Sequence, residues 1–395
     1  MSIIYIHYPY CLSKCPYCDF NSHVSQTIDF TGLKQSYQNE LGYFADQVID
    51  KNISTIFFGG GTPSLMPIAL VENILATIHK LFKVDINAEI SLEANPTSVE
   101  ADKFRELKKI GINRLSLGIQ ALNDDDLKFL GRQHNASEAQ NAIKMAQKYF
   151  ENFSFDLIYA RPKQTLQNWQ DELQKALQYQ SPHLSLYQLT IEKGTKFYTQ
   201  YQQQKFLLPD ENLASNLYES TNEIIEKFGY FRYEVSNYAK SGFQCRHNLG
   251  YWQSKDYIGV GAGAHSRIFV KNKDLRQAII MEHEPNNWIK KSISKKAGIQ
   301  SIQEITKNEL IEEFFLMGLR LESGVLASDF YNLTKLNLLE IFNQQKLNFL
   351  LQNNFLKLTK SADDTKIFIP KNQMILSQSI ILKLIEAIDK FKIVN

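Results

Sequence analysis

Three cysteines near the N-terminus, Cys11, Cys15 and Cys18, lie within eight consecutive residues of the 395-residue chain. They follow an apolar run at residues 3–6 that is typical of a β-strand. Three thiolates can hold three irons of a four-iron, four-sulfur (4Fe–4S) cluster and leave the fourth iron open to another ligand. A structural zinc site has four protein ligands, and no fourth ligand is near in the sequence. These residues favour a cluster, with zinc as the alternative.

Short apolar segments alternate with longer segments of helical character over the first half of the chain. The predicted strands are residues 3–7, 54–58, 89–93, 114–119, 153–159 and 183–190. Parallel neighbours need crossovers of this length, so the pattern predicts a parallel sheet, covered by helices, that curls into a partial or full (β/α) barrel. Capping boxes predict helices that begin at Thr97, with Glu100, and at Ser137, with Gln140.

Conspicuous polar residues fall where these strands end, which is where functional residues gather in such folds. The cysteine loop follows the first strand, and glycines 59–61 follow the second. Successive glycines expose backbone N–H and C=O groups, so this loop can hold a small zwitterion beside an open iron. Further candidates at or near the later strand ends are Glu93, Gln120, Arg132, Asp156 and Thr190.

A second group of versatile residues lies at 245–252, where cysteine, histidine and tyrosine occur together. These are axial ligands of haem iron, and aromatic rings can cover a porphyrin face. Aromatic packing with His247 as an ordinary hydrogen-bonding residue explains the same pattern, and the residues alone favour that interpretation. The following segment, 259–266, is predicted to be one strand that approaches a neighbouring backbone closely.

The composition indicates a globular protein with two domains. The hydrophobic fraction is 44%, the charged fraction 22% and the net charge +2, which argues against nucleic acid as a partner. Four cysteines give no disulfide framework, and no apolar run reaches the length of about 18 residues that a membrane-spanning helix needs. The first strand begins at once, without room for a signal peptide. We therefore expect a cytoplasmic location. We expect domains at 1–270 and 271–395, the second mostly helical with a hairpin and winged-helix-like.

Several motifs together resemble the radical S-adenosylmethionine (SAM) family of oxygen-independent coproporphyrinogen III oxidases. Tyr5, His7 and Pro9 precede the cysteines as in that family, and the resemblance continues at 59–64, 93–96, 115–120, 130–132, 156–159, 233–237 and 318–325. Within it the sequence is similar to the HemW-like haem chaperone branch. No cysteine follows Cys18 directly, only ten residues precede Cys11, and residues 247–252 match a haem-associated motif of that branch.

This resemblance implies a partial (β/α)6 radical SAM barrel with a C-terminal winged-helix-like domain. It implies a 4Fe–4S cluster on the three cysteines and SAM on the open iron. The residues implied for SAM are Tyr5, Tyr17, Gly60, Gly61, Thr62, Glu93, Gln120, Arg132, Asp156, Thr190 and His265. Those implied for haem, from the segment 233–266, are His247, Asn248, Tyr251 and Trp252.

Three functions remain open on the sequence. The favoured one is a haem chaperone, monomeric or homodimeric, that passes haem to acceptors such as membrane respiratory enzymes, with a bacterioferritin-like protein as a possible donor. The alternative is an oxidase that decarboxylates coproporphyrinogen III to protoporphyrinogen IX. A binding module stabilised by zinc or a cluster, without redox work, is the third. No catalytic residue is assigned.

Overall fold

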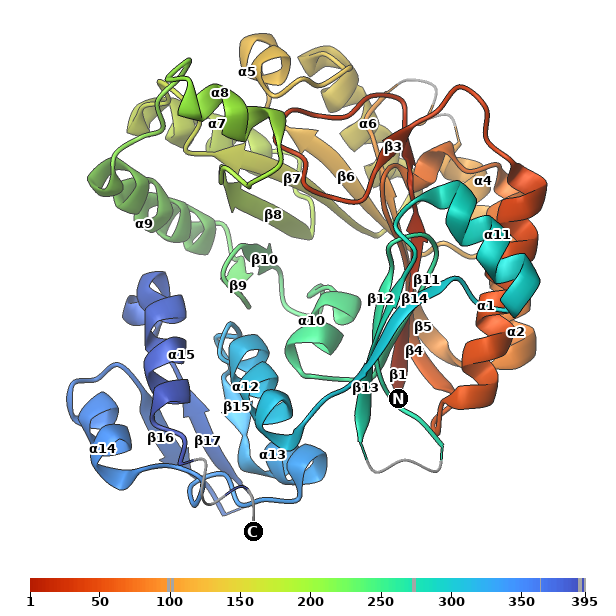
Figure 1. Ribbon diagram of the computed structural model, residues 1–395. Helices are drawn as coiled ribbons and strands as arrows, with labels where there is room; N and C mark the ends of the chain where they lie inside the picture. The colour runs from red at the N-terminus through yellow and green to blue at the C-terminus, as the bar shows by residue number, and fades with distance from the viewer. Residues whose placement is uncertain (98–99, 101–102, 272–274, 363, 390–392, 394–395) are drawn as a thin grey trace.

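The computed structural model describes residues 1–97, 100, 103–271, 275–362, 364–389 and 393 (Figure 1). Two large hydrophobic cores organise the chain. The larger core surrounds a long curved sheet and its helices, and the smaller one lies in the C-terminal region, drawn in blue in Figure 1.

The centre of the large sheet is a row of six parallel strands, which confirms the predicted parallel α/β architecture. Each overlaps a predicted strand. They are β1 (Ser2–Tyr8), β4 (Asn52–Gly60), β5 (Lys83–Ala94), β6 (Arg114–Gln120), β7 (Asn152–Tyr159) and β8 (His183–Gln188).

Helices cover the outer face of this sheet, and the inner face carries polar and aromatic side chains. Leu92, Leu115 and Leu117 belong to the hydrophobic core, whereas Glu93 and Ser116, which alternate with them along the strands, line an interior cavity. The barrel therefore has a lumen lined by charged, polar and aromatic groups. The covering helices include α1 (Phe30–Gln47), α2 (Ile68–Leu81), α4 (Phe104–Lys109), α6 (Ala136–Tyr149), α7 (Leu166–Leu177) and α9 (Glu211–Lys227).

One of the two capping predictions differs from the structure, and the other falls partly outside the described residues. The prediction that a helix begins at Ser137 is wrong: α6 begins at Ala136, because the Asn135 side chain accepts from Glu138 N and Glu138 reaches back to the Asn135 backbone. For the helix predicted from Thr97, the Thr97 hydroxyl does bond Glu100, at 3.2 Å, but residues 98–99 and 101–102 lie outside the described residues.

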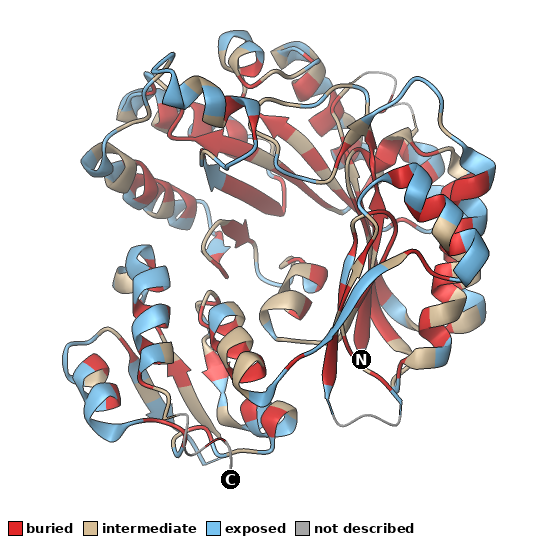
Figure 2. Ribbon diagram, in the orientation of Figure 1, coloured by how far each residue is buried: buried red, intermediate tan, exposed pale blue. Residues whose placement is uncertain are grey.

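The sheet extends beyond the six strands at both ends. Next to β1 lie β11 (Tyr257–Val260), β12 (His265–Phe269), β13 (Arg276–Met281) and β14 (Ile299–Glu304), and beyond β8 lie β10 (Asn237–Ala239) and β9 (Phe231–Arg232). The prediction of one strand over 259–266 is wrong, because Gly261 and Gly263 have φ of +116° and +78° and turn the chain between β11 and β12. The close approach is real: a Cβ on Gly259 would lie 2.0 Å from the His265 carbonyl oxygen. Figure 2 shows the central strands buried and β14 largely exposed.

The C-terminal region combines helices with a small sheet, as predicted for a winged-helix-like domain. It contains α12 (Lys307–Gly318), α13 (Ala327–Thr334), α14 (Gln344–Gln352), α15 (Ser377–Glu386) and a sheet of three described strands, β15 (Val325–Leu326), β17 (Thr365–Phe368) and β16 (Lys357–Lys360). Because β13 and β14 belong to the large sheet, we propose a domain boundary near residue 305 in place of 271.

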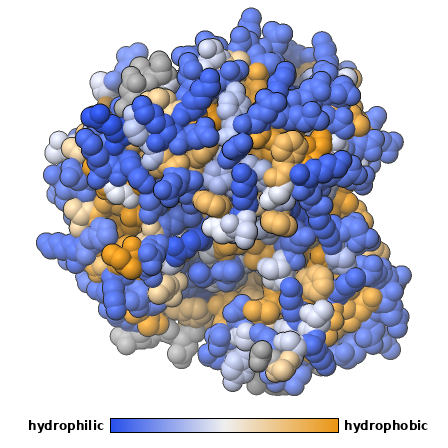
Figure 3. Space-filling model, turned by 180° about the vertical axis from the view of Figure 1, so that it is seen from behind, coloured by the Kyte–Doolittle hydropathy of each residue, from blue (hydrophilic) through white to orange (hydrophobic). Residues whose placement is uncertain are grey.

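The molecular surface carries both hydrophilic and hydrophobic residues. The face seen in Figure 3 is mostly hydrophilic, with hydrophobic residues in small separate groups. Among the described helices, none combines the length and the apolar character needed to cross a bilayer.

Candidate functional site

The cysteine loop lies at the carboxyl end of β1 and forms one wall of a cavity of about 150 Å³. It begins in β2 (Tyr10–Cys11), and Cys18 N donates to Cys15 O over 3.1 Å, which folds the loop back on itself. All three thiols are half-buried and line this cavity. The structure brings to the same cavity eight further predicted residues: Tyr17, Gly60, Gly61, Thr62, Glu93, Gln120, Arg132 and Asp156.

Two of the thiol sulfurs accept hydrogen bonds from a connected polar network. Thr62 Oγ1 donates to Cys11 Sγ, and Arg132 Nη1 donates to Cys15 Sγ, each over 3.3 Å. Asn95 joins the two donors, because its Nδ2 donates to Thr62 Oγ1 at 3.1 Å and its Oδ1 accepts from Arg132 Nη2 at 2.6 Å. Asn95 was not among the predicted site residues; it directly follows the last residue of β5, and its place two residues after Glu93 was the available signal.

The glycine loop after β4 packs directly on the segment that leads into Cys11. A Cβ at Gly61 would lie 2.5 Å from the Tyr10 carbonyl oxygen, and Gly60 has φ of +111°. Gly61 N donates to Tyr8 O at 2.7 Å and Thr62 N to Tyr10 O at 2.9 Å. Glycine is thus required here both for close backbone approach and for a left-handed conformation.

Gln120 ends β6 in a strained backbone conformation. Its φ is +72°, its side chain is 9% exposed, and the register between β6 and β7 shifts just before it. A non-glycine residue held in the left-handed region costs free energy and is frequent at functional sites. At this register shift, Gln120 becomes part of the wall of the cysteine cavity.

Two carboxylates, Glu93 and Asp156, stand where the cysteine cavity meets a second cavity in the barrel lumen. Burial, together with the negative charge of Asp156, raises the pKa of Glu93 to about 8. Burial also raises the pKa of Asp156 to about 6, against the opposing effect of Ser185, Arg114 and Arg132. Glu93 is therefore mostly a neutral hydrogen-bonding group near pH 7.

The second cavity, of about 250 Å³, contains most of the predicted haem residues. The short helix α10 (Arg246–Trp252) enters the lumen there, and Glu89 accepts hydrogen bonds from its first N–H groups. His247 is 2% exposed; Nδ1 lies 2.7 Å from Thr55 Oγ1 and Nε2 lies 3.2 Å from Tyr251 Oη. Both ring nitrogens of His247 thus have partners within the protein.

The remaining predicted residues have different surroundings. Asn248 and Tyr251 line the lumen cavity, whereas the Trp252 ring lies under the Arg320 guanidinium of the C-terminal domain at 4.7 Å. Tyr17 lines the cysteine cavity, but Tyr5 lines the lumen cavity instead. Thr190 and His265 are exposed and line neither cavity, because Thr190 lies beyond the end of β8 and His265 lies on β12, on the far side of β1.

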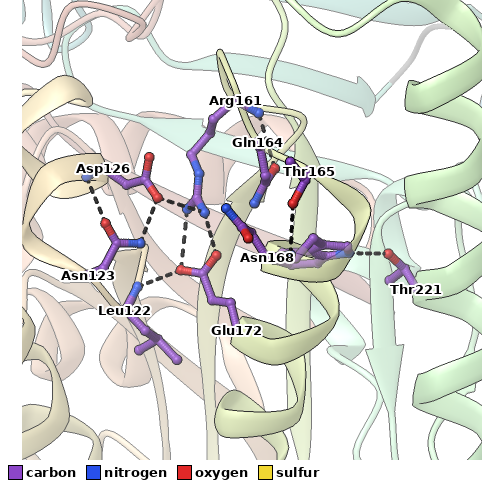
Figure 4. Close-up of polar contacts among 10 residues, drawn as sticks. Leu122, Asn123, Asp126, Arg161, Gln164, Thr165, Asn168, Glu172 and Thr221 are labelled. Atoms are coloured by element: carbon purple, nitrogen blue, oxygen red, sulfur yellow. Dashed lines mark hydrogen bonds and ion pairs between the residues drawn. The ribbon is translucent and has the colours of Figure 1, made fainter.

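A buried ion-pair network braces the loops that follow β6 and β7 (Figure 4). Arg161 bonds both carboxylate oxygens of Glu172 and lies 3.0 Å from Asp126 Oδ2. Glu172 Oε1 also accepts from Leu122 N at 2.7 Å, two residues after Gln120. The network thereby holds the loop that directly follows Gln120.

Comparison with known proteins agrees with this geometry. Residues 5–176 match the Radical SAM superfamily, and residues 305–362 match the HemN C-terminal domain. Heme chaperone HemW of Haemophilus influenzae is 37% identical, over 92% of this chain and 93% of that protein. The chain belongs to the HemW-like branch of the radical SAM coproporphyrinogen III oxidase family. Heme chaperone HemW of Escherichia coli is 40% identical over 67% of this chain and 70% of its own.

Other relatives of this HemW-like chain extend the comparison. A mitochondrial radical S-adenosyl methionine domain-containing protein 1 of Danio rerio is 36% identical over 82% of this chain and 73% of that protein. Coproporphyrinogen III oxidase (HemN) from Escherichia coli has the same fold, with a TM-score of 0.78 over 97% of this chain and 90% of that one. At 18% identity this last likeness shows the fold alone.

Proposed function

We propose that this HemW-like protein is a cytoplasmic haem chaperone that carries a 4Fe–4S cluster and SAM and passes haem to acceptor proteins, among them membrane respiratory enzymes. The observation that carries the proposal is the convergence of the cysteine loop and the glycine loop on one cavity, in a chain whose relatives include proteins named heme chaperone.

The residues around the cysteines suit a cluster with one open iron. Three thiols face one cavity, and Thr62 and Arg132 donate hydrogen bonds to two of the sulfurs. Cys245 is remote in sequence, buried, and near the Glu89 carboxylate at 3.5 Å, where burial raises its pKa to about 12. Cys11, Cys15 and Cys18 are therefore the proposed ligands.

The rest of the cavity suits SAM. The glycine loop offers backbone groups for the amino and carboxylate ends, and Glu93 and Asp156 offer oxygens for ribose hydroxyls. Gln120 and Arg132 complete the proposed lining, and the half-buried position limits the access of water. A reduced cluster can transfer one electron to a bound sulfonium; the protein's part is to hold the two groups together.

Iron and labile sulfide analysis after anaerobic reconstitution tests the cluster. The expected result is iron and sulfide in wild-type protein, lost together in Cys15→Ser and retained in the control Cys245→Ser. One zinc per chain in place of iron would favour the binding-module alternative.

Haem is the proposed cargo, and the lumen motif is its proposed contact. Because Nε2 of His247 is 3.2 Å from Tyr251 Oη, coordination of iron by His247 requires that this bond be released. Haem titration followed by the Soret band should show weaker binding for His247→Ala with Tyr251→Ala, and unchanged binding for His79→Ala on the exposed face of α2. Equal affinity in all three proteins would refute this haem site.

The family fold also admits coproporphyrinogen III oxidase activity. An anaerobic assay with reductant, SAM and coproporphyrinogen III decides between the two functions. We expect no vinyl-containing product, and formation of protoporphyrinogen IX at a rate dependent on Cys15 would replace the chaperone proposal.

A further inference from the structure

Arg114, the first residue of β6, is a buried cation that lines the lumen cavity. It is 2% exposed, and its guanidinium makes one hydrogen bond within the described residues, from Nη2 to Ser154 Oγ at 2.9 Å. No carboxylate of the described residues lies within ion-pair distance of it. A guanidinium has five N–H donors, so most of its capacity is unused.

The other buried arginines of the described chain have the carboxylate counter-ion that Arg114 lacks. Each of them lies within 3.8 Å of a carboxylate oxygen; they are Arg161, Arg232 and Arg276. A buried charge without a counter-ion carries a large desolvation cost, and proteins ordinarily pair such charges. Arg114 departs from that rule at a cavity wall, where a ligand can supply the counter-ion.

Three carboxyl groups interact electrostatically with Arg114: Glu93, which accepts from Gly60 N at 3.2 Å, and Glu89 and Asp156, which also have other partners. Glu89 accepts hydrogen bonds from Arg246 N and His247 N at 3.1 Å each and from the Cys245 thiol at 3.5 Å. Its carboxylate therefore bonds the first residues of α10. Asp156 accepts a hydrogen bond from the Ser185 side chain. None of the three closes an ion pair with Arg114, although Glu89 and Asp156 lower the free energy of its charge at longer range.

Neutral polar groups complete the environment of the Arg114 guanidinium. His183, Asn237 and Asn248 line the same cavity of about 250 Å³ and carry N–H groups that can donate to an anionic head group. Ser116, Glu93 and Asp156 line both this cavity and the cysteine cavity. A ligand held at Arg114 therefore extends toward the place proposed for SAM.

We propose that Arg114 anchors a monocarboxylate in the barrel lumen, next to the proposed SAM site. The planar guanidinium fork matches a carboxylate in bidentate geometry. One negative charge is favoured over two, because Asp156 and Glu89 already place acidic groups near the cavity. The small volume admits either a short free acid or one carboxylate arm of a larger molecule, such as a propionate of haem. The interpretation as a haem propionate rests on the proposed haem function; the interpretation as a short free acid does not.

Sodium propionate is the probe for the free-acid source. We expect propionate, at constant ionic strength, to raise the midpoint of thermal unfolding of the reconstituted full chain in a saturable way. Arg114→Met should bind propionate at least tenfold more weakly. Ser154→Ala, which removes the one hydrogen bond of Arg114 but keeps its charge, should stay within about threefold of wild type. If Arg114→Met does not fold, Arg114→Lys takes its place, with weaker binding because the fork is lost.

Comparing the affinities of haem and haem dimethyl ester tests whether the carboxylate bound at Arg114 is a propionate of haem. If the carboxylate is an arm of haem, wild type should prefer haem to the ester by at least tenfold, and Arg114→Met should lose the preference. A propionate-dependent shift without that preference assigns the site to a small free acid. Binding of propionate without binding of either haem form would reject the haem function and keep this site. The inference is overturned if wild type shows neither a propionate effect nor a preference for the free-acid form of haem.

Discussion

Asn95 Oδ1 accepts a hydrogen bond of 2.6 Å from Arg132 Nη2, and this contact connects the donors of two different cysteines. Through its other end Asn95 holds Thr62, which donates to Cys11, while Arg132 donates to Cys15. One carboxamide at the end of β5 thus orients hydrogen bonds to two of the three sulfurs. Hydrogen bonds to ligand sulfurs stabilise the reduced, more negative form of an iron–sulfur cluster.

The first prediction concerns the substitution Asn95→Leu, which keeps the branched shape of the side chain and removes both contacts. The reduction potential of the reconstituted cluster should become more negative, because Thr62 and Arg132 are no longer held against the sulfurs. A potentiometric titration followed by electron paramagnetic resonance measures it. Asn135→Leu, at the start of α6, is the matched control and should leave the potential unchanged. An unchanged potential in Asn95→Leu would show that the network does not tune the site.

The second prediction uses two glycines. Gly61→Ala places a Cβ 2.5 Å from the Tyr10 carbonyl, so the backbone before Cys11 must shift. We expect a loss of about 1–3 kcal/mol in the free energy of unfolding and reduced iron content after reconstitution. Gly42→Ala, inside α1 with no atom within 4 Å of the added Cβ, should instead stabilise the protein by up to about 1 kcal/mol. Urea denaturation and iron analysis of both variants give the comparison.

The third prediction is a pH dependence. The pKa of Glu93 is raised in the folded state from 4.5 to about 8, so the folded protein binds a proton over a pH range in which the unfolded chain has lost it. The contribution of Glu93 to stability is therefore complete below about pH 4.5 and is lost as the pH rises through 8. Glu93→Gln stays neutral, so the stability of this variant relative to wild type should increase from pH 5 to pH 8. Equilibrium unfolding at several pH values checks the sign; a constant difference would contradict it.

Local pattern in the sequence was enough for the central architecture and for the main residues of the cavity. The six parallel strands follow from short apolar runs between helical segments, and the carboxyl ends of such strands meet at one edge, which brings the cysteines, Gly60, Glu93 and Gln120 together. The roles of these residues stay proposals, but their proximity required no tertiary information beyond the order of strands.

Contacts between distant segments could not be predicted in this way. The partner of His247 Nδ1 is Thr55, 192 residues earlier, and no local pattern indicates that α10 enters the lumen. Likewise β13 and β14 join the large sheet through antiparallel pairing, so their residues looked like the start of a second domain. Arg114 was read only as the start of a strand, because an unpaired charge is visible only after its surroundings have folded.

The last prediction concerns the network in Figure 4. Arg161→Leu leaves Glu172, which is 7% exposed, as a buried carboxylate without its counter-ion. Breaking one side of such a pair costs about 3–5 kcal/mol, whereas replacing both charges by apolar groups is often close to neutral. We therefore expect a large loss of stability in Arg161→Leu and substantial recovery in the double variant with Glu172→Leu. Recovery should stay incomplete, because Leu122 N also loses the acceptor that it has at 2.7 Å. Chemical denaturation of wild type, both single variants and the double variant gives the interaction free energy, and additive effects of the two substitutions would show that the pair does not brace these loops.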